Sequence, residues 1–531
     1  MKKFLNKISN RLIPMMLLMV LAVACKEELD ELEPMRMFTP TAGFRALSSE
    51  TQVKLTWNRS LYTTATDGVT YTVEVAEDTL FQTPVILSVQ TDTAGVVFTD
   101  EQLQVRQDYF ARVKANALGD RPESNWVVSN SFRISGEQIF APLQDADVID
   151  VAVVLRWREE PGLTRIVLTP EVGEPIEVAL TEADIAERRM RVEGLTPTTV
   201  YTAEIFQGTQ SKGITTFTTK ETLVGDAVID LTGITDRPSV LMDTLSQIES
   251  GSTVVLKRGM TYEISSTTNL DRSVTIVSEN TLDPQLATIY FTSNFNIEEG
   301  SEIDSLVFRN VVMRSSDYGG KYVFNINKAS DIGMLKFDAV HAEIFRGIVR
   351  LQSAGINIDE FAVVNSVIDS VANYGVLTID NAGANVNHIL FSNSTFYKIE
   401  RVMTSKAGSQ SIVIENTTFS EAPEGGRYLI DYNSNDVADG IIVRNTLIGR
   451  GKNSGGSREV RGIRAGSGTL IESSSTYATS DYVATSNEIP GLSSYSGTSF
   501  DLFTDPENGN FTIKDTNFDG ASNTGDPRWR P

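Results

Sequence analysis

Four charged side chains recur in the carboxyl-terminal half of this sequence, at intervals of 30, 26 and 25 residues. They are Arg350, Asp380, Lys406 and Asp431. A lysine or arginine removes a proton from a substrate when its own pKa is lowered. Two carboxylates can hold Ca²⁺ through their hard oxygen atoms, or can work as a pair in hydrolysis. These chemistries require elements that bring the four side chains to one face.

Short segments that alternate apolar and polar residues carry these charges. They are 324–327, 349–352, 377–380, 403–406 and 430–433. In a strand, residues two apart lie on the same side. We therefore expect one outward face, formed by Asn325, Arg350, Thr378, Thr404 and Asp431 and by Asn327, Gln352, Asp380, Lys406 and Asn433. Tyr432 falls on the inward side and is expected in the core.

A short sequence motif also recurs, in which apolar residues are followed by an asparagine or aspartate. Successive copies are separated by 28, 27, 28, 23 and 29 residues. A period of this length indicates stacked repeats, each of which buries its apolar face on its neighbours. Asparagine and aspartate tolerate the left-handed geometry of a sharp bend, and in register their side chains can hydrogen-bond between coils. We interpret this column as structural: Asn310, Asp338, Asn365, Asn393, Asn416 and Asn445.

Two or three short strands per repeat of about 27 residues resemble the right-handed parallel β-helix of the pectate-lyase superfamily. A leucine-rich repeat would need denser leucines and a helical half. The β-helix is expected over 221–531 and includes a carboxyl-terminal closing segment. An amphipathic helix at 241–248 is expected to shield its first coil.

The resemblance implies that the outward face carries a polysaccharide groove. In that superfamily Ca²⁺ or a basic residue neutralises a uronate carboxylate, and a lysine or arginine removes the neighbouring proton. Lys406 and Arg350 are the candidates for this base, and Asp380 and Asp431 are the candidate ligands of Ca²⁺. Aromatic rings can stack on the apolar faces of sugars. The candidate glycan-binding residues are Asp380, Asp431, Asn433, Tyr374 and Tyr428, and Arg458, Arg461 and Arg464 are candidates for a carboxylate-binding rim.

Two shorter modules precede the repeats. In 37–136 a strand ends at Trp57, and Leu103 lies six residues before Tyr109. The same spacing returns in 137–220 with Trp157, Leu195 and Tyr201, in a shortened copy. The pattern resembles the tyrosine corner of fibronectin type III domains. The expected fold class is therefore all-β, with two fibronectin type III-like sandwiches followed by the β-helix, and the modules serve as spacers.

The amino terminus has the pattern of a lipoprotein signal peptide over 1–24. Four positive charges precede an apolar run, 12–24, which is shorter than the roughly 20 residues of a membrane span. The run ends before Cys25, which we expect to carry lipid, although an ordinary secretory signal with a stray cysteine is the alternative. An acidic tether follows at 25–36 and resembles the export signal of surface lipoproteins in glycan-utilisation systems. The expected location is the outer face of the outer membrane.

Composition excludes several function classes. The net charge is −23, and without residues 1–24 it is 42 − 69 = −27, which argues against nucleic acid as a partner. One cysteine and two histidines leave no intrachain disulfide and little scope for a zinc centre. We expect a protein that binds or presents an acidic polysaccharide, alongside other glycan-utilisation proteins. The alternatives are a lyase that cleaves a uronic-acid glycan by β-elimination, favoured over a hydrolase, and an adhesion or structural protein.

Overall fold

The computed structural model describes residues 35–40, 44–82, 84–223 and 227–531. Cys25, the signal segment and most of the acidic tether lie outside the described residues, so the expected lipidation stays a prediction. Contacts within the chain form two compact units: the first contains most residues up to 218, and the second contains 219–531 with two short segments, 144–153 and 193–198. Each unit is described by itself.

The first module is a sandwich of two antiparallel sheets. One sheet has the order β1 (Arg45–Ser48), β2 (Gln52–Thr56), β5 (Gly95–Thr99). The other has the order β4 (Leu87–Thr91), β3 (Tyr71–Ala76), β6 (Phe110–Ala115), β7 (Val127–Val128). Trp57 is buried between them, and the Tyr109 hydroxyl accepts a hydrogen bond of 3.1 Å from the Gln104 N–H. Both the core tryptophan and the tyrosine corner are confirmed.

The second module is smaller. Its larger sheet has the order β10 (Ile176–Ala179), β9 (Arg165–Pro170), β12 (Val200–Gln207), β13 (Gln210–Thr218). The other sheet pairs β11 (Arg189–Glu193) with β8 (Ala152–Arg156), and helix α2 (Glu182–Glu187) precedes β11. Trp157 and Tyr201 are buried. The second module therefore has two sheets, as the first module does, but its smaller sheet has two strands.

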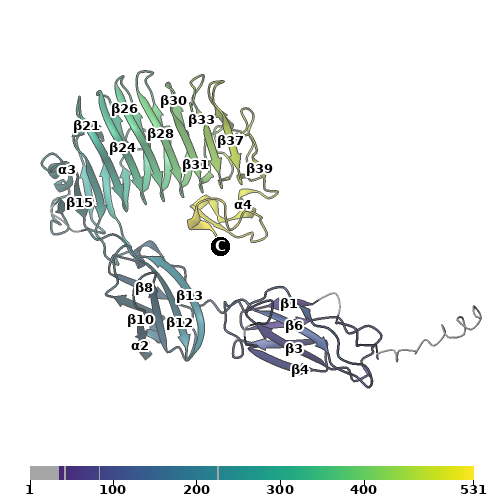
Figure 1. Cartoon of the computed structure of the whole chain (residues 1–531). Coiled ribbons are helices and arrows are strands. Elements are labelled where there is room, and N and C mark those ends of the chain that lie inside the picture. The colour runs from purple at the N-terminus through teal and green to yellow at the C-terminus, as the bar shows by residue number, and fades with distance from the viewer. Residues whose placement is uncertain (1–34, 41–43, 83, 224–226) are drawn as a thin grey trace, which may run out of the picture. The chain divides into compact units, whose positions relative to one another are not determined.

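Parallel strands of successive coils then stack into a β-helix (Figure 1) with three faces. Face A is a ten-stranded sheet of β14 (Val228–Asp230), β15 (Ser252–Leu256), β18 (Val274–Ser278), β21 (Glu302–Arg309), β24 (Ser330–Asp338), β26 (Ile356–Val364), β28 (Asn385–Ser392), β31 (Ser411–Glu415), β34 (Ile441–Arg444) and β37 (Ile471–Ser474). The two other faces share the long strands β25 (His341–Leu351) and β27 (Val367–Ile379).

The first halves of β25 and β27 belong to face B and their second halves to face C. The other strands of face B are β16 (Thr261–Ile264), β19 (Ala287–Phe291), β22 (Val311–Ser315), β29 (Thr395–Ile399), β32 (Thr418–Ser420), β35 (Leu447–Ile448), β38 (Tyr477–Ala478) and β39 (Ser493–Ser494). The other strands of face C are β17 (Thr268–Leu270), β20 (Phe295–Ile297), β23 (Tyr322–Ile326), β30 (Met403–Ser405), β33 (Tyr428–Asp431) and β36 (Arg461–Arg464).

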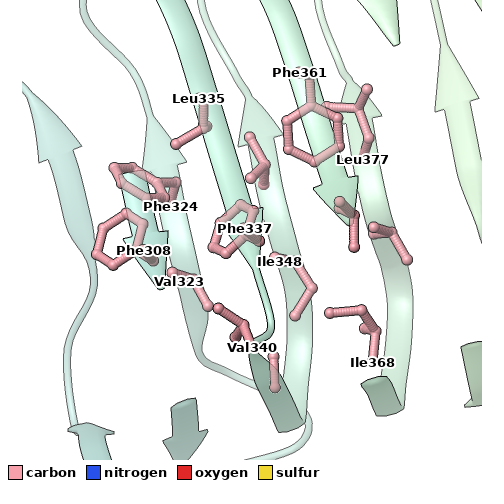
Figure 2. Packing of buried hydrophobic residues seen from close by; sticks show 14 of the residues in the cluster. Phe308, Val323, Phe324, Leu335, Phe337, Val340, Ile348, Phe361, Ile368 and Leu377 are labelled. Atoms are coloured by element: carbon pink, nitrogen blue, oxygen red, sulfur yellow. The ribbon is translucent and has the colours of Figure 1, made fainter. Parts of the chain in front are cut away.

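Apolar side chains from all three faces fill the interior. Phe308 of β21 stacks on Phe337 of β24, with ring centroids 5.6 Å apart, and Phe324 enters from face C (Figure 2). Tyr432 is fully buried, as its inward position predicts. At the first coil, helix α3 (Val240–Leu245) contributes Leu241 and Leu245 to the same core. The predicted covering helix is therefore present, although it is shorter than 241–248.

The asparagine column makes the sharp bend between face A and face B. Asn310, Asn365, Asn393, Asn416 and Asn445 all have φ between 47° and 52°. Side chains also link coils, because Asn393 Nδ2 donates to Asn365 Oδ1 at 3.2 Å and Asn365 Nδ2 donates to Asp338 Oδ1 at 3.0 Å. One assignment was wrong: the left-handed residue in the second coil is Ala339, because Asp338 still belongs to β24 and pairs with Val364.

The carboxyl-terminal segment packs along the flank of the β-helix. It contains α4 (Ser499–Leu502), β40 (Phe503–Asp505) and β41 (Asn510–Ile513) (Figure 1). Phe503 and Phe511 form a separate cluster with Tyr397 and Leu447 of face B. The segment therefore covers the carboxyl-terminal half of face B.

Candidate functional site

A polar groove of about 310 Å³ lies on face C and contains most of the predicted site residues. It is lined by Tyr374 and Asp380 of the coil that contains β27, by Lys406 after β30, and by Asp431 and Asn433 at the end of β33. Parallel pairing explains this grouping: Thr378 is in register with Thr404, which is in register with Asp431. The structure thus brings residues far apart in sequence to one surface, as the alternation of the segments predicts.

Asp380 is held between the two candidate bases. Its carboxylate accepts a hydrogen bond of 3.0 Å from Arg350 Nε and one of 2.7 Å from Lys406 Nζ. Burial acts to raise the pKa of Asp380, but the bonds from Lys406 and Arg350 outweigh it, so the pKa lies below the usual range. Asp380 is therefore an anion at neutral pH, and it lies between two cations.

Arg350 is unsuited to remove a proton in this arrangement. Burial acts to lower its pKa, but the bond to Asp380 and the neighbouring Tyr322 and Tyr374 outweigh it, and the pKa of Arg350 is raised. A catalytic base needs the opposite shift. Lys406 is 65 % exposed in its side chain and donates to both the carboxylate and the backbone carbonyl of Asp380. The predicted roles of Lys406 and Arg350 in proton transfer stay untested predictions.

Asp431 is also paired. Arg464 donates from Nε and from a terminal nitrogen to the two carboxylate oxygens, at 2.8 Å each, and the Asn433 N–H donates to Asp431 Oδ1 at 3.1 Å. Asp380 and Asp431 would have to exchange these partners for an ion in order to bind Ca²⁺. The residues as they are arranged do not form an open calcium site, and the calcium interpretation stays a prediction.

The two candidate tyrosines contact arginines. The Arg350 guanidinium carbon lies 4.4 Å from the centre of the Tyr374 ring, and that of Arg346 lies 4.7 Å away. Arg464 lies 4.3 Å from the centre of the Tyr428 ring. Such contacts are favourable because the ring face is electronegative. The tyrosines thus hold arginines beside the groove in place, in addition to any contact with a sugar.

Sequence reasoning missed Arg401, which lines both the groove and an adjoining recess of about 180 Å³. Among the described residues it has no carboxylate within ion-pair distance, and its Nε is buried without a hydrogen-bond partner. Burial, and then the charge of Arg427, lowers the pKa of Arg401 below the ordinary arginine value, yet an arginine stays protonated at neutral pH. Arg401 precedes β30, so strand alternation gives no indication of its direction.

Gly375 allows Arg401 to approach the neighbouring coil. Its φ is 65°, and a Cβ there would collide with the carbonyl oxygen of Arg401. Only glycine adopts this geometry without a steric penalty. The recess beside Arg401 also contains Arg427, Arg461 and Arg464, two of them from the basic run that the sequence indicated as a rim. Arg458 is directed elsewhere, toward Glu421 at 3.3 Å.

Two family models match parts of the β-helix. Both are described as domains of unknown function: DUF4957 matches residues 260–399 and DUF5123 matches residues 412–529. The first match ends and the second begins on either side of β30, so Arg401, Thr404 and Lys406 of the groove lie between the two matched regions. No curated protein matches the chain.

Two solved structures from chicken resemble the fibronectin-like part. The FN1–FN3 domains of CNTN1 share 16 % identity over 35 % of this chain and 69 % of that chain, with a TM-score of 0.16. A two-domain fibronectin type III segment of tenascin shares 15 % identity over 34 % of this chain and 99 % of that chain, with a TM-score of 0.18. TM-scores this low do not support a fold assignment. The fibronectin type III-like fold is assigned instead from the sheet order and the tyrosine corner. In the described part of the chain, no helix is long and apolar enough to cross a membrane.

Proposed function

We propose that the groove on face C binds an acidic polysaccharide without cleaving it, in a protein displayed at the outer surface of a cell by a lipid on Cys25. The observation that carries the proposal is Arg401, a charged guanidinium at the groove wall with no carboxylate partner among the described residues. An arginine binds a carboxylate through two parallel hydrogen bonds. A uronate carboxylate supplies the missing partner.

The shape of the site favours a chain over a small molecule. The groove and the adjoining recess share Arg401, Thr404 and Asp431, so they form one continuous surface across several coils. Adjacent parallel strands lie about 4.8 Å apart, and a ligand that crosses three coils therefore extends over about 10 Å. Hydroxyl and amide groups of Thr404, Ser405 and Asn433 line the wall and match the hydroxyl groups of sugars.

The charges support binding over β-elimination. Arg350 and Lys406 are both committed to Asp380, and the pKa of Arg350 is raised. Asp380 is an anion and lacks the proton that a general acid must donate. The fibronectin-like modules, in this proposal, hold the β-helix away from the membrane, where it can meet the glycan together with other surface proteins of glycan utilisation.

The decisive experiment measures binding of the purified chain to a panel of uronic-acid polysaccharides and to neutral glycans by isothermal titration calorimetry. We expect binding to at least one uronan, and we expect Arg401→Ala to weaken it by at least about tenfold, because the substitution removes the pair of charge-assisted hydrogen bonds. The matched control is Arg444→Ala on face A, since Arg444 is paired with Glu415 and is half exposed. Equal effects of the two substitutions, or no uronan binding, would refute the proposal.

The same samples test the lyase alternative. β-Elimination creates unsaturated chain ends that absorb ultraviolet light, so the absorbance of each uronan is followed with and without EDTA. We expect no increase. A steady increase that disappears in Lys406→Ala would contradict the noncatalytic proposal and would assign the groove to a lyase.

A further inference from the structure

A cluster of one histidine and two carboxylates lies on face B, away from the groove on face C. His341 and Glu343 are two residues apart on β25, and Ala342 between them is buried, so both side chains point outward. Asp369 of β27 is the register partner of Glu343 in the next coil. One ligand atom from each of the three residues lies within 4.8 Å of the other two, and the described part of the chain contains no second such group.

The histidine has a nitrogen without a partner. His341 Nε2 is buried, makes no hydrogen bond, and lies 3.8 Å from Asp369 Oδ2. The Ser370 hydroxyl donates a hydrogen bond to the other carboxylate oxygen of Asp369, Oδ1, so that Oδ2 is the atom that faces the histidine. Glu343 is oriented by Arg314, whose Nη1 lies 2.6 Å from Glu343 Oε1.

We propose that His341, Glu343 and Asp369 bind one divalent transition-metal ion of the zinc type. An imidazole nitrogen and carboxylate oxygens are ligands that Zn²⁺ accepts, at bond lengths near 2.0–2.2 Å. Two ligands at tetrahedral positions are then about 3.4 Å apart. The 3.8 Å between His341 Nε2 and Asp369 Oδ2 is close to this value, so small side-chain movements complete the geometry.

Such an ion connects two coils. His341 and Glu343 come from one coil and Asp369 from the next, so the ion bridges β25 and β27 across the sheet. The ion gives His341 Nε2 a partner and neutralises two adjacent carboxylates. Of these two carboxylates, only that of Glu343 has an arginine within ion-pair distance among the described residues. Three protein ligands leave a fourth position for water. The proposal stands on this cluster alone and does not depend on glycan binding.

The test titrates the metal-stripped, purified chain with Zn²⁺ by isothermal titration calorimetry. We expect one ion per chain. His341→Ala and Asp369→Asn each remove a ligand and are expected to weaken binding at least tenfold. The chain contains only one other histidine, His388 of β28, whose Nδ1 lies 2.8 Å from Ser411 Oγ on face A. His388→Ala is therefore the matched control and is expected to bind Zn²⁺ as the parent chain does.

Two further measurements separate a metal site from a fold defect. Circular dichroism without metal should be the same for all variants, and Asp369→Asn keeps the size of the side chain. With Co²⁺, the parent chain and His388→Ala should show the visible absorption bands that are typical of an ion with few ligands. His341→Ala and Asp369→Asn should not show these bands. The proposal is overturned by the absence of saturable binding at one ion per chain, by retention of binding in His341→Ala, or by its loss in His388→Ala.

Discussion

The charged residues in and beside the groove fall into two kinds. Arg350, Lys406 and Arg464 form ion pairs with Asp380 or Asp431, whereas Arg401 has no such partner among the described residues. The paired residues stiffen the surface, because each charge-assisted bond joins neighbouring coils. The unpaired guanidinium is left to meet an anionic ligand. Substitution of a paired residue should therefore lower the stability of the fold, whereas substitution of Arg401 should weaken ligand binding.

Asp380→Asn tests the structural half of this division. The folded-state pKa of Asp380 is lowered, so its contribution to stability is present above the unfolded value of about 4 and is lost as the pH falls below it. At pH 7 we expect Asp380→Asn to lower the free energy of unfolding by about 1 kcal/mol, a figure reduced for solvent screening. Thermal unfolding at pH 7 and below pH 4 measures it, and the difference from the parent chain should shrink in acid.

The control for this substitution is Asp359→Asn on face A, where the carboxylate accepts a hydrogen bond from Asn387 at 2.8 Å. We expect it to change the unfolding midpoint much less than Asp380→Asn at pH 7. A pH-independent difference between Asp380→Asn and the parent chain would contradict the ion-pair explanation.

At the scale of the element, the bend between face A and face B decides how each coil closes. Five coils place asparagine at the left-handed position and a later coil places Ser475 there, with φ of 46°, but one coil places Ala339 there, with φ of 53°. Alanine in this conformation costs roughly 1–2 kcal/mol, and asparagine less, because its short polar side chain bonds locally. The alanine is therefore a weak point in an otherwise regular column.

Ala339→Asn should stabilise the β-helix by about 0.5–1 kcal/mol, whereas Asn393→Ala should destabilise it by a similar amount. Asn393→Ala also removes the 3.2 Å bond to Asn365. Thermal unfolding of the β-helix measures both. Ala354→Asn is the control, since the φ of Ala354 is not positive. If Ala339→Asn lowers the midpoint, side-chain crowding outweighs the relief of backbone strain, and left-handed strain at Ala339 does not limit the stability of the column.

Periodicity predicts the parts of this molecule that repeat. The alternation in 377–380, 403–406 and 430–433 placed Asp380, Lys406 and Asp431 on one surface, because parallel strands in register align equal positions. It could not reveal that Asp380 joins Arg350 to Lys406, since side-chain pairing depends on rotamers across coils. Arg401 and Gly375 were missed for another reason: Arg401 lies outside the strands, and Gly375 interrupts β27 with a positive φ, so strand alternation applies to neither.

At the scale of the whole molecule, the second unit leaves face C open and covers part of face B. Trp529 donates from Nε1 to Thr395 Oγ1 at 2.8 Å, and Asp526, which is almost fully buried, accepts from the same hydroxyl at 2.8 Å. The ring of Trp529 also contacts that of Phe511, with centroids 5.8 Å apart. The last residues of the chain therefore attach the segment to coils that precede it by more than 100 residues.

Trp529→Ala tests how much this attachment contributes. The substitution removes an aromatic contact and leaves the Thr395 hydroxyl without its indole donor, so we expect a loss of about 2 kcal/mol in the free energy of unfolding, less than for a fully buried tryptophan. A chain that ends at Gly497 loses the part of the cluster that follows this residue, including Phe503 and Phe511, and exposes Tyr397 and Leu447. It should unfold at a lower temperature still and be cleaved faster by protease, because exposed apolar surface lowers the stability of the coils beneath it. Leu470→Ala, at a residue 62 % exposed on the same β-helix, should change the midpoint little. Should the shortened chain unfold at the parent temperature, the segment is an appendage, and the coils of face B are stable without it.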